Sequence, residues 1–213
     1  TKHGDVDRLA FTGSTAVGRK IAETAGKNLT RVSLEFGGKS PNVIFEDADL
    51  ENAVNGVIKG IFAATGQTCL AGSRVLVHED IYDEFVDRLT SRAGEIKLGD
   101  PRDSETEMGP VAFRRQWETV RKYINKGVKE GAKVGFGGKM PDSQPGECFI
   151  QPTVLTDVDN GMTVAQEEIF GPVASIISFS SETEAIDLAN DVDFGLAAAV
   201  WTQKMGRANR FVE

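Results

Sequence analysis

The sequence predicts an α/β fold in which a mostly parallel sheet is flanked by helices. Short apolar segments alternate with amphipathic ones along the chain, a pattern typical of β-α-β units. The first unit is complete, with strands over 9–11 and 31–34 joined by a helix over 15–25, and such a crossover makes the strands parallel. The composition, 40% hydrophobic and 26% charged, is that of an ordinary globular protein with a sizeable core.

Each later element follows from periodicity and turn residues. A strand is expected over 41–45, followed by a helix that Asp49 caps, that carries apolar residues at the 3.6-residue period and that ends at Gly66. The other expected elements are strands over 74–77, 153–155, 173–179 and 197–201, helices over 81–96, 114–130, 182–190 and from 205 onward, a surface loop over 98–110, and a linker-like stretch over 135–147.

The bulk properties exclude several classes of function. A net charge of −8 argues against an electrostatic grip on nucleic acid or on an anionic membrane. The apolar runs are too short to span a bilayer, and no charged-then-apolar leader opens the chain. Two cysteines are too few for a disulfide framework and two histidines supply a metal site poorly, so we expect a cytoplasmic protein without a metal centre.

Both ends of the chain look internal to a longer protein. The first residue is Thr1 rather than Met, and a strand follows almost at once. The last residues, from Met205, read as a helix without a capping Gly or Pro. We therefore expect a piece of a longer chain.

Cys69 is the candidate nucleophile. It follows an apolar helix and lies among glycines and small polar residues, in the segment TGQTCLAGSR. Reactive thiols occur at helix ends and in loops where the thiolate can form, whereas structural thiols are buried and inert. From these neighbours alone, a buried and inert cysteine is an open alternative. Cys148 lies at the entrance of a strand, and we expect it to be structural or incidental.

Glu35 is the candidate general base. It ends an apolar strand 34 residues before Cys69 and is followed by two glycines and Lys39. Its apolar neighbours would partly desolvate the carboxylate, which suits a base that takes a proton from water. A salt-bridged acid at a strand end is the alternative. Lys39 does not complete a phosphate loop, because the spacing G-x-x-x-x-G-K-[ST] is missing.

The segment GSTAVG at 13–18 is a candidate cofactor contact. It stands at a strand-to-helix junction, where backbone amides and a helix N-terminus can face a pyrophosphate. It lacks the G-x-G-x-x-G fingerprint, and glycines are common at such turns, so the motif is weak by itself.

Four segments together resemble the aldehyde dehydrogenase superfamily, of the NAD(P)-dependent, hydrolytic type. They are FTGS at 11–14, LEFGGKSPN at 34–42, TGQTCLAGSR at 65–74 and EIFGPV at 168–173, in the family's order and spacing. The resemblance covers essentially the whole chain. It implies the Rossmann-like α/β catalytic domain of that fold, truncated at both ends, with 1–35 as the tail of the cofactor-binding domain and 36–213 as an incomplete catalytic domain.

The resemblance also implies roles for individual residues. Cys69 would pass through a thiohemiacetal and a thioester, and Glu35 would activate the water that hydrolyses the thioester. The cofactor would be NAD or NADP, with NAD favoured. Glu168 would hold the ribose on the nicotinamide side and Phe170 would pack near the nicotinamide, both on one side of an extended segment. Gln116 is implied at the adenine ribose by alignment alone. The cofactor-binding residues implied in all are Gly13, Ser14, Val17, Leu34, Glu168 and Phe170.

Two other functions stay open at this point. A CoA-acylating semialdehyde dehydrogenase would pass the acyl group to a thiol instead of water, although such relatives generally lack the base at Glu35. The chain could also be an inactive structural or binding member of the family. We expect the full-length protein to be a homodimer or homotetramer that acts on a small-molecule aldehyde and binds neither nucleic acid nor membrane. The isolated chain is expected to be inactive, because most of the cofactor sheet and an oxyanion donor lie outside it.

Overall fold

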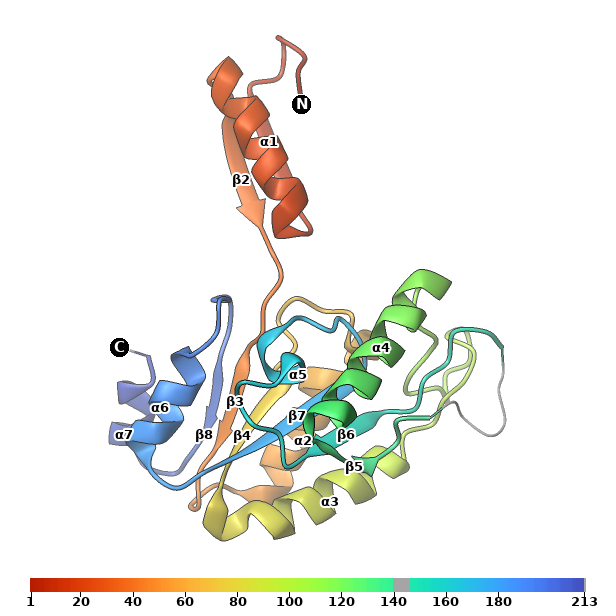
Figure 1. Cartoon of the computed structure of the whole chain (residues 1–213), viewed down its shortest axis with the longest axis vertical. Helices are drawn as coiled ribbons and strands as arrows, with labels where there is room; N and C mark the ends of the chain where they lie inside the picture. Colours follow the sequence, from red (N-terminus) through yellow and green to blue (C-terminus); the bar gives the residue numbers. More distant parts are fainter. Residues whose placement is uncertain (140–145, 213) are drawn as a thin grey trace. The chain divides into compact units, whose positions relative to one another are not determined.

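The computed structural model describes residues 1–139 and 146–212, and the chain divides into two compact units, Thr1–Gly38 (unit 1) and Lys39–Glu213 (unit 2) (Figure 1). Part of the expected linker-like stretch, 140–145, lies outside the described residues. Among the described residues, no helix is both long and apolar enough to cross a membrane.

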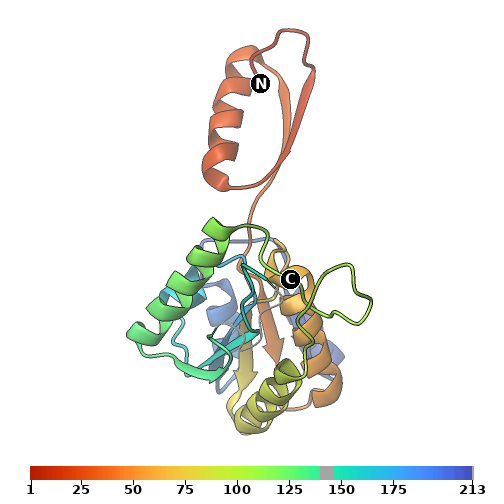
Figure 2. The same ribbon diagram turned by 90° about the vertical axis from the view of Figure 1, so that its right-hand side faces the viewer.

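Unit 1 is a single β-α-β element. Strands β1 (Arg8–Thr12) and β2 (Arg31–Glu35) pair in parallel, and helix α1 (Thr15–Asn28) joins them and lies along one face of the pair (Figure 2). All of unit 1 is described, and Ala25 is its only buried hydrophobic residue. One helix therefore covers one face of a two-stranded ribbon and leaves most of its apolar surface open to solvent.

Unit 2 is built on a sheet whose six described strands follow the order β5-β6-β7-β4-β3-β8. The described pairs are parallel except β5–β6, which is antiparallel. The central strands are apolar almost throughout, as strands covered on both faces must be. The strands are β3 (Pro41–Ile44), β4 (Arg74–His78), β5 (Lys133–Phe136), β6 (Thr153–Thr156), β7 (Val173–Phe179) and β8 (Ala199–Trp201).

Helices cover both faces of this sheet. They are α2 (Leu50–Phe62), α3 (Tyr82–Gly94), α4 (Arg114–Glu130), α5 (Thr163–Gln166), α6 (Glu182–Asn190) and α7 (Met205–Arg210), with the 3-10 turns η1 (Ala63–Gly66) and η2 (Glu79–Ile81). Side chains alternate along a strand, so β4 serves two cores. Val75 and Val77 join the core under α2 and α3, whereas Leu76 joins the core under α4, α5 and α6.

The fold class and the order of the expected elements are confirmed, with three differences in detail. Strand β5 takes in two residues of the stretch expected to be a linker, because pairing with β6 stabilises an edge strand in which a glycine lowers the strand propensity. Helix α5, a single turn, was not expected. Helix α2 ends at Phe62 rather than at Gly66, because Ala64 and Thr65 leave the right-handed helical conformation.

Candidate active site

Cys69 lies on the loop between η1 and β4, and its side chain is half-buried. Before the loop, the chain turns through Ala64, Thr65 and Gly66 with φ angles of 49°, 58° and 69°. A left-handed conformation costs roughly 1–2 kcal/mol for each residue that carries a Cβ. Strain of this kind persists only where surrounding contacts hold it, and it is concentrated at functional sites.

Two contacts hold this left-handed turn. The hydroxyl of Thr65 donates a hydrogen bond of 3.2 Å to the carbonyl of Gly109. Gly66 lies directly against the backbone of Gly171, where a Cβ added to Gly66 would come within 2.1 Å of the carbonyl oxygen. The close approach fixes the loop of Cys69 beside the segment that ends at Gly171.

That segment, between α5 and β7, carries Glu168 and Phe170. Phe170 has a φ of 55° and is 39% exposed, whereas Glu168 is half-buried. The expected extended conformation is therefore wrong at Phe170, because a left-handed residue breaks the alternation of side chains along a strand. Gly171 approaches Val120 so closely that a Cβ there would come within 2.4 Å of its methyl group. The segment is a bent connection that is packed on α4.

Two side chains of α4 hold the same segment by hydrogen bonds. The amide group of Gln116 donates to the carbonyls of Ile169 and Phe170, each at 2.9 Å. The hydroxyl of Tyr123 donates to a carboxylate oxygen of Glu167 at 2.7 Å. Burial and this contact raise the pKa of Tyr123 to about 12, so the hydroxyl keeps its proton near neutral pH. Gln116 thus holds the backbone of this segment in place. Its implied contact with the adenine ribose stays a prediction.

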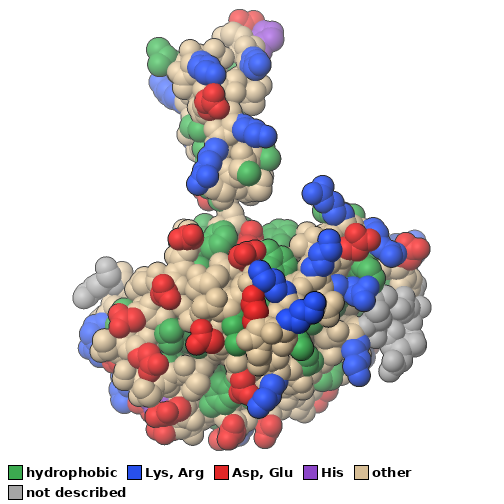
Figure 3. All heavy atoms as spheres, in the orientation of Figure 1, with side chains coloured by type: hydrophobic (Ala, Val, Ile, Leu, Met, Phe, Trp, Pro, Cys, Tyr) green, Lys and Arg blue, Asp and Glu red, His purple; other side chains and the backbone are tan. Residues whose placement is uncertain are grey.

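Helix α4 is itself firmly placed. On its inner face, Trp117, Val120 and Ile124 belong to the buried core. Lys and Arg side chains gather over its outer face (Figure 3), and the guanidinium groups of Arg114 and Arg121 lie 4.7 Å and 4.6 Å from the ring centroid of Trp117. The two hydrogen-bonding side chains therefore project from a rigid element.

Arg74, the first residue of β4, is fully buried. It donates to the carbonyls of Leu188 and Ala189 at 2.5 Å and 2.6 Å, and to the side-chain oxygen of Asn160 at 3.2 Å. Burial lowers the pKa of Arg74 to about 10, which still leaves it charged near neutral pH. The residue ties the end of α6 to the sheet.

Lys39 precedes β3 and is only 1% exposed, and its Nζ has no hydrogen-bond partner among the described residues. Burial and the nearby charge of Arg74 lower the pKa of Lys39 to about 7, against the attraction of Glu168 and Glu167. In the sequence analysis, this lysine was considered only as part of a phosphate loop, which the missing spacing excluded. Its position directly before the apolar strand was the one feature of the sequence that could have indicated its burial.

In unit 1, Gly13, Ser14 and Val17 form the turn from β1 into α1. The backbone N–H of Gly13 donates to the carbonyl of Glu35 at 3.0 Å, and the Ser14 hydroxyl caps the helix by accepting from the N–H of Val17 at 3.4 Å. Val17 is 45% exposed, and the first turn of this fully described helix contains no acidic residue. No acidic side chain in this first turn competes with an anion for the helix N-terminus. Such a terminus can face the phosphate of a dinucleotide, and the exposed Val17 side chain can pack on its flat base.

Leu34 and Glu35 end β2 in the same unit. The pairing of Phe11 with Leu34 and of Thr12 with Glu35 places these residues and Ser14 at the carboxyl edge of the strand pair. Leu34 is half-buried and Glu35 is exposed. The partly desolvated setting expected for Glu35 is not found within unit 1, because a single helix covers this ribbon.

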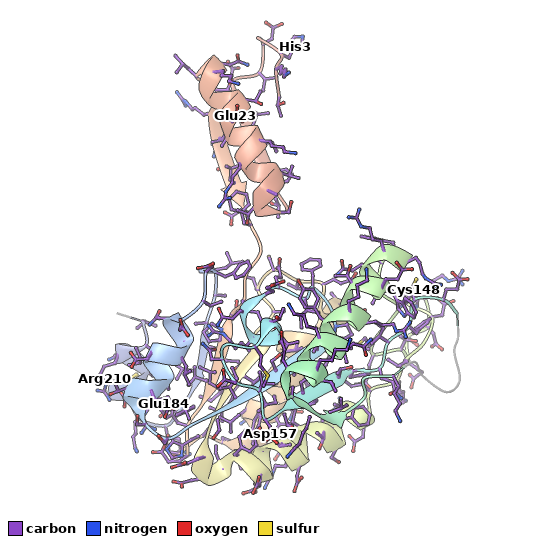
Figure 4. The ribbon with its side chains drawn as sticks, in the orientation of Figure 1. His3, Glu23, Cys148, Asp157, Glu184 and Arg210 are labelled. Carbon is purple, nitrogen blue, oxygen red and sulfur yellow. The ribbon has the colours of Figure 1, made fainter. Side chains whose placement is uncertain are left out.

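The candidate residues thus fall into two groups. Unit 1 holds Gly13, Ser14, Val17, Leu34 and Glu35, and unit 2 holds Cys69, Glu168 and Phe170. Within unit 2 the Gly66–Gly171 contact brings the cysteine loop and the Glu168 segment together. Cys148 (Figure 4) is half-buried and packs against the core on the α4 side of the sheet.

A hollow of about 680 Å³ in unit 1 does not coincide with these residues. Its lining residues are Gly4, Val6, Asp7, Arg8, Asn28, Leu29, Thr30 and Arg31. They surround the amino ends of β1 and β2, whereas ligands of parallel sheets bind at the carboxyl ends. We assign no role to this hollow. Within the described part of the chain, no three or more His, Cys, Asp or Glu residues are grouped so that they could hold a metal ion.

Known proteins resemble this chain closely. The model of the aldehyde dehydrogenase family matches residues 1–213. The chain is 50% identical over 211 residues to an aldehyde dehydrogenase of Emericella nidulans, covering 99% of this chain and 42% of that protein. It is also 50% identical over 208 residues to the mitochondrial aldehyde dehydrogenase of Homo sapiens, covering 97% of this chain and 40% of that protein.

Solved structures agree with these relatives. The NAD+ complex of aldehyde dehydrogenase from Bacillus cereus matches with a TM-score of 0.95 and 47% identity, covering 99% of this chain and 43% of that one. Betaine aldehyde dehydrogenase from Staphylococcus aureus in complex with NAD+ matches with a TM-score of 0.95 and 43% identity, covering 99% of this chain and 42% of that one. The chain therefore spans about two fifths of the length of its relatives.

Proposed function

The chain belongs to the aldehyde dehydrogenase family, and we propose that a protein of its relatives' full length that contains this chain oxidises an aldehyde to a carboxylic acid with NAD or NADP. The observation that carries this proposal is the setting of Cys69. Its half-buried thiol follows a strained turn that Gly66 fixes against Gly171, next to the segment of Glu168. A nucleophile and a cofactor-binding carboxylate would thus share one rigid region.

Cys69 performs the first half of the proposed reaction. Its thiolate adds to the carbonyl carbon of the aldehyde, so that a C–S bond forms and the oxygen takes the electron pair. When the C=O bond re-forms, the hydrogen on that carbon leaves as hydride and a thioester stays on Cys69. The bound cofactor supplies the hydride acceptor. Covalent addition replaces one difficult step with two easier ones.

Glu35 performs the second half. Its carboxylate takes a proton from water, and the water oxygen attacks the thioester carbonyl. The C–S bond then breaks, which returns the thiolate and releases the carboxylic acid. A positioned base of this kind contributes roughly 10²–10⁴ in rate.

The chain's residues fit a dinucleotide in two places, and we propose NAD as the favoured cofactor because the similar structures described above are NAD+ complexes. The turn of Gly13, Ser14 and Val17 would hold the pyrophosphate and the adenine side, with Leu34 beside it. Glu168 would accept hydrogen bonds from the ribose hydroxyls, and Phe170 would pack near the nicotinamide.

The remaining details belong to the same proposal. Residues 1–35 would be the tail of the cofactor-binding domain and 36–213 most of the catalytic domain. The full-length protein would be a cytoplasmic homodimer or homotetramer. Relatives carry the names betaine aldehyde dehydrogenase and 5-carboxymethyl-2-hydroxymuconate semialdehyde dehydrogenase, so small polar aldehydes are the first substrates to test. Glu35 favours hydrolysis over transfer to coenzyme A.

The test is NADH formation from such aldehydes by the full-length protein, with and without coenzyme A. Cys69→Ser should abolish NADH formation, while Cys148→Ala keeps most of it. NADH formation by Cys69→Ser at a comparable rate would contradict the mechanism. A requirement for coenzyme A would replace hydrolysis with acyl transfer.

A further inference from the structure

Three segments of unit 2 are joined to one another around the candidate nucleophile. They are the cysteine loop (64–69), the stretch that leads into α4 (109–116, the α4 entrance) and the Glu168 segment (167–171). Gln116 joins the α4 entrance to the Glu168 segment, and the close approach of Gly66 and Gly171 joins the Glu168 segment to the cysteine loop. Hydrogen bonds close the remaining side, between the cysteine loop and the α4 entrance.

Two hydrogen bonds make that remaining side. The hydroxyl of Thr65 donates to the carbonyl of Gly109 at 3.2 Å, and the backbone N–H of Ala112 donates to Oε1 of the half-buried Gln67 at 3.0 Å. The Nε2 group of Gln67 donates at 3.4 Å to the carbonyl of Ala64, which also accepts the backbone N–H of Gln67 at 3.1 Å. The side-chain amide of Gln67 therefore links its own loop with the α4 entrance.

Gln67 stands between the left-handed turn and Cys69. The backbone at 64–66 is strained, and such strain persists only where surrounding contacts hold it. Directly after Gln67, the N–H of Ala71 donates to the carbonyl of Thr68 at 3.1 Å, so Cys69 lies in a tight turn. Relaxation of the strained backbone would therefore be passed on to the turn of Cys69 unless a contact holds the residue between them.

We propose that Gln67 is a positioning residue, whose side-chain amide holds the cysteine loop to the α4 entrance and so fixes the thiol of Cys69 relative to the Glu168 segment. The inference rests on the proposed function, since it takes Cys69 as the nucleophile. The amide of Gln67 is engaged by Ala112 and Ala64, so Gln67 acts through the backbone of its loop and not on the substrate.

A purely stabilising role of Gln67 would have different consequences. A side chain that only stabilises the fold changes the fraction of folded enzyme, but not the rate constant of the molecules that are folded. A positioning residue changes that rate constant. The affinity for NAD should not change, because the hydrogen bonds of Gln116 to the Glu168 segment do not involve Gln67.

The test is the rate constant of NADH formation in a single turnover, measured by stopped flow with full-length enzyme and NAD in excess over the aldehyde. Gln67→Met keeps the length of the side chain but removes both of its hydrogen bonds. It should lower the rate constant roughly ten- to a hundredfold, because a shift of about 1 Å in a reacting group costs rate on that scale. The dissociation constant of NAD should be unchanged. Gln203→Met, at an exposed glutamine that follows β8, is the matched control and should change neither value.

Two further variants test whether the acceptor of Gln67 must reach the α4 entrance. Gln67→Glu keeps an acceptor for the N–H of Ala112 at the same reach, so it should retain most of the rate constant. Gln67→Asn keeps the amide on a side chain one methylene shorter, and it should be as slow as Gln67→Met. The introduced carboxylate disfavours a neighbouring thiolate, so the rate constants are compared at high pH, where thiols are ionised.

The outcomes separate this inference from the proposed function. A rate constant that is unchanged in Gln67→Met and Gln67→Asn, or that falls equally in Gln67→Glu, would overturn the role of Gln67 and leave the proposed function standing. If Gln67→Met failed to fold, an unchanged rate constant in Gln67→Asn would overturn that role by itself. Absence of NADH formation by the unsubstituted protein would overturn the proposed function together with the inference.

Discussion

Unit 1 and unit 2 both contain a β-α-β crossover, yet the apolar side chains of its strands are much more deeply buried in unit 2 than in unit 1. In unit 1, one helix covers two strands, and Ala25 is the only buried hydrophobic residue. In unit 2, helices cover both faces of the sheet, and β4 and β7 are buried along nearly their whole length. Two strands alone are marginally stable in water, whereas a sheet covered on both faces holds its own core. The β-α-β crossover therefore determines how the strands are arranged, whereas the helices on both faces of the sheet provide the stability.

The sharpest test of this comparison is native-state hydrogen exchange of the 213-residue chain. Backbone amides of β4 should exchange only on global unfolding, whereas those of β1 and β2 should exchange through local opening that costs little. The expected difference in protection is roughly 5 kcal/mol or more, the scale of global stability. Comparable protection of β2 and β4 would break the comparison.

A pair of phenylalanines probes the same difference by mutation. Phe85 of α3 is fully buried, and Phe85→Ala should lower the free energy of unfolding of unit 2 by about 3–5 kcal/mol. Phe36 is half-buried, with its ring against Gly18 of α1, and Phe36→Ala should leave that free energy within about 0.5 kcal/mol. Denaturant unfolding followed by tryptophan fluorescence measures both, because Trp117 and Trp201 belong to unit 2. A large effect of Phe36→Ala would show that unit 1 contributes to the core of unit 2.

The proposed chemistry divides along the same line, with the nucleophile in unit 2 and the base in unit 1. In the full-length protein, Glu35→Gln should keep the first hydride transfer and slow steady-state turnover by about 10²–10⁴. Rapid-quench kinetics should then show a burst of NADH near one equivalent per site. An unchanged steady-state rate would make Glu35 a structural residue. Glu51→Gln, at an exposed acid of α2, serves as the control.

Two adjacent alanines offer the finest comparison, since both are exposed and only their backbone differs. Ala64 has a φ of 49° and Ala63 a φ of −55°. Glycine relieves the left-handed strain at Ala64 but adds chain entropy to the unfolded state, so Ala64→Gly should stabilise the chain by about 0.5–1 kcal/mol. Ala63→Gly has only the entropic cost and should destabilise it by a similar amount. Thermal unfolding measures both, and equal signs would contradict the strain argument.

Local signals explain how far the sequence could predict this structure. The helix after Asp49 and the strand at β4 were predictable, because apolar periodicity and capping are properties of neighbouring residues. The end of α2 was not, because alanine and threonine rarely take positive φ and here do so under contacts with Gly109 and Gly171. In the same way, the residues around Lys39 in the sequence cannot show that it is buried, because its burial depends on how segments far apart in the chain pack together.

The two glycines at 66 and 171 also bear on how such a sequence can vary. Neither position has room for a Cβ, since Gly66 meets the carbonyl of Gly171 and Gly171 meets Val120. A side chain at Gly66 would have to move the backbone of Gly171, whose own Cα lies against Val120 of α4. We therefore expect epistasis among the three positions, so that a substitution at one of them is tolerated better when a neighbouring position has also changed. Within the family, we expect little sequence variation at these three positions. Changes that adjust substrate or cofactor preference are expected at the residues around them.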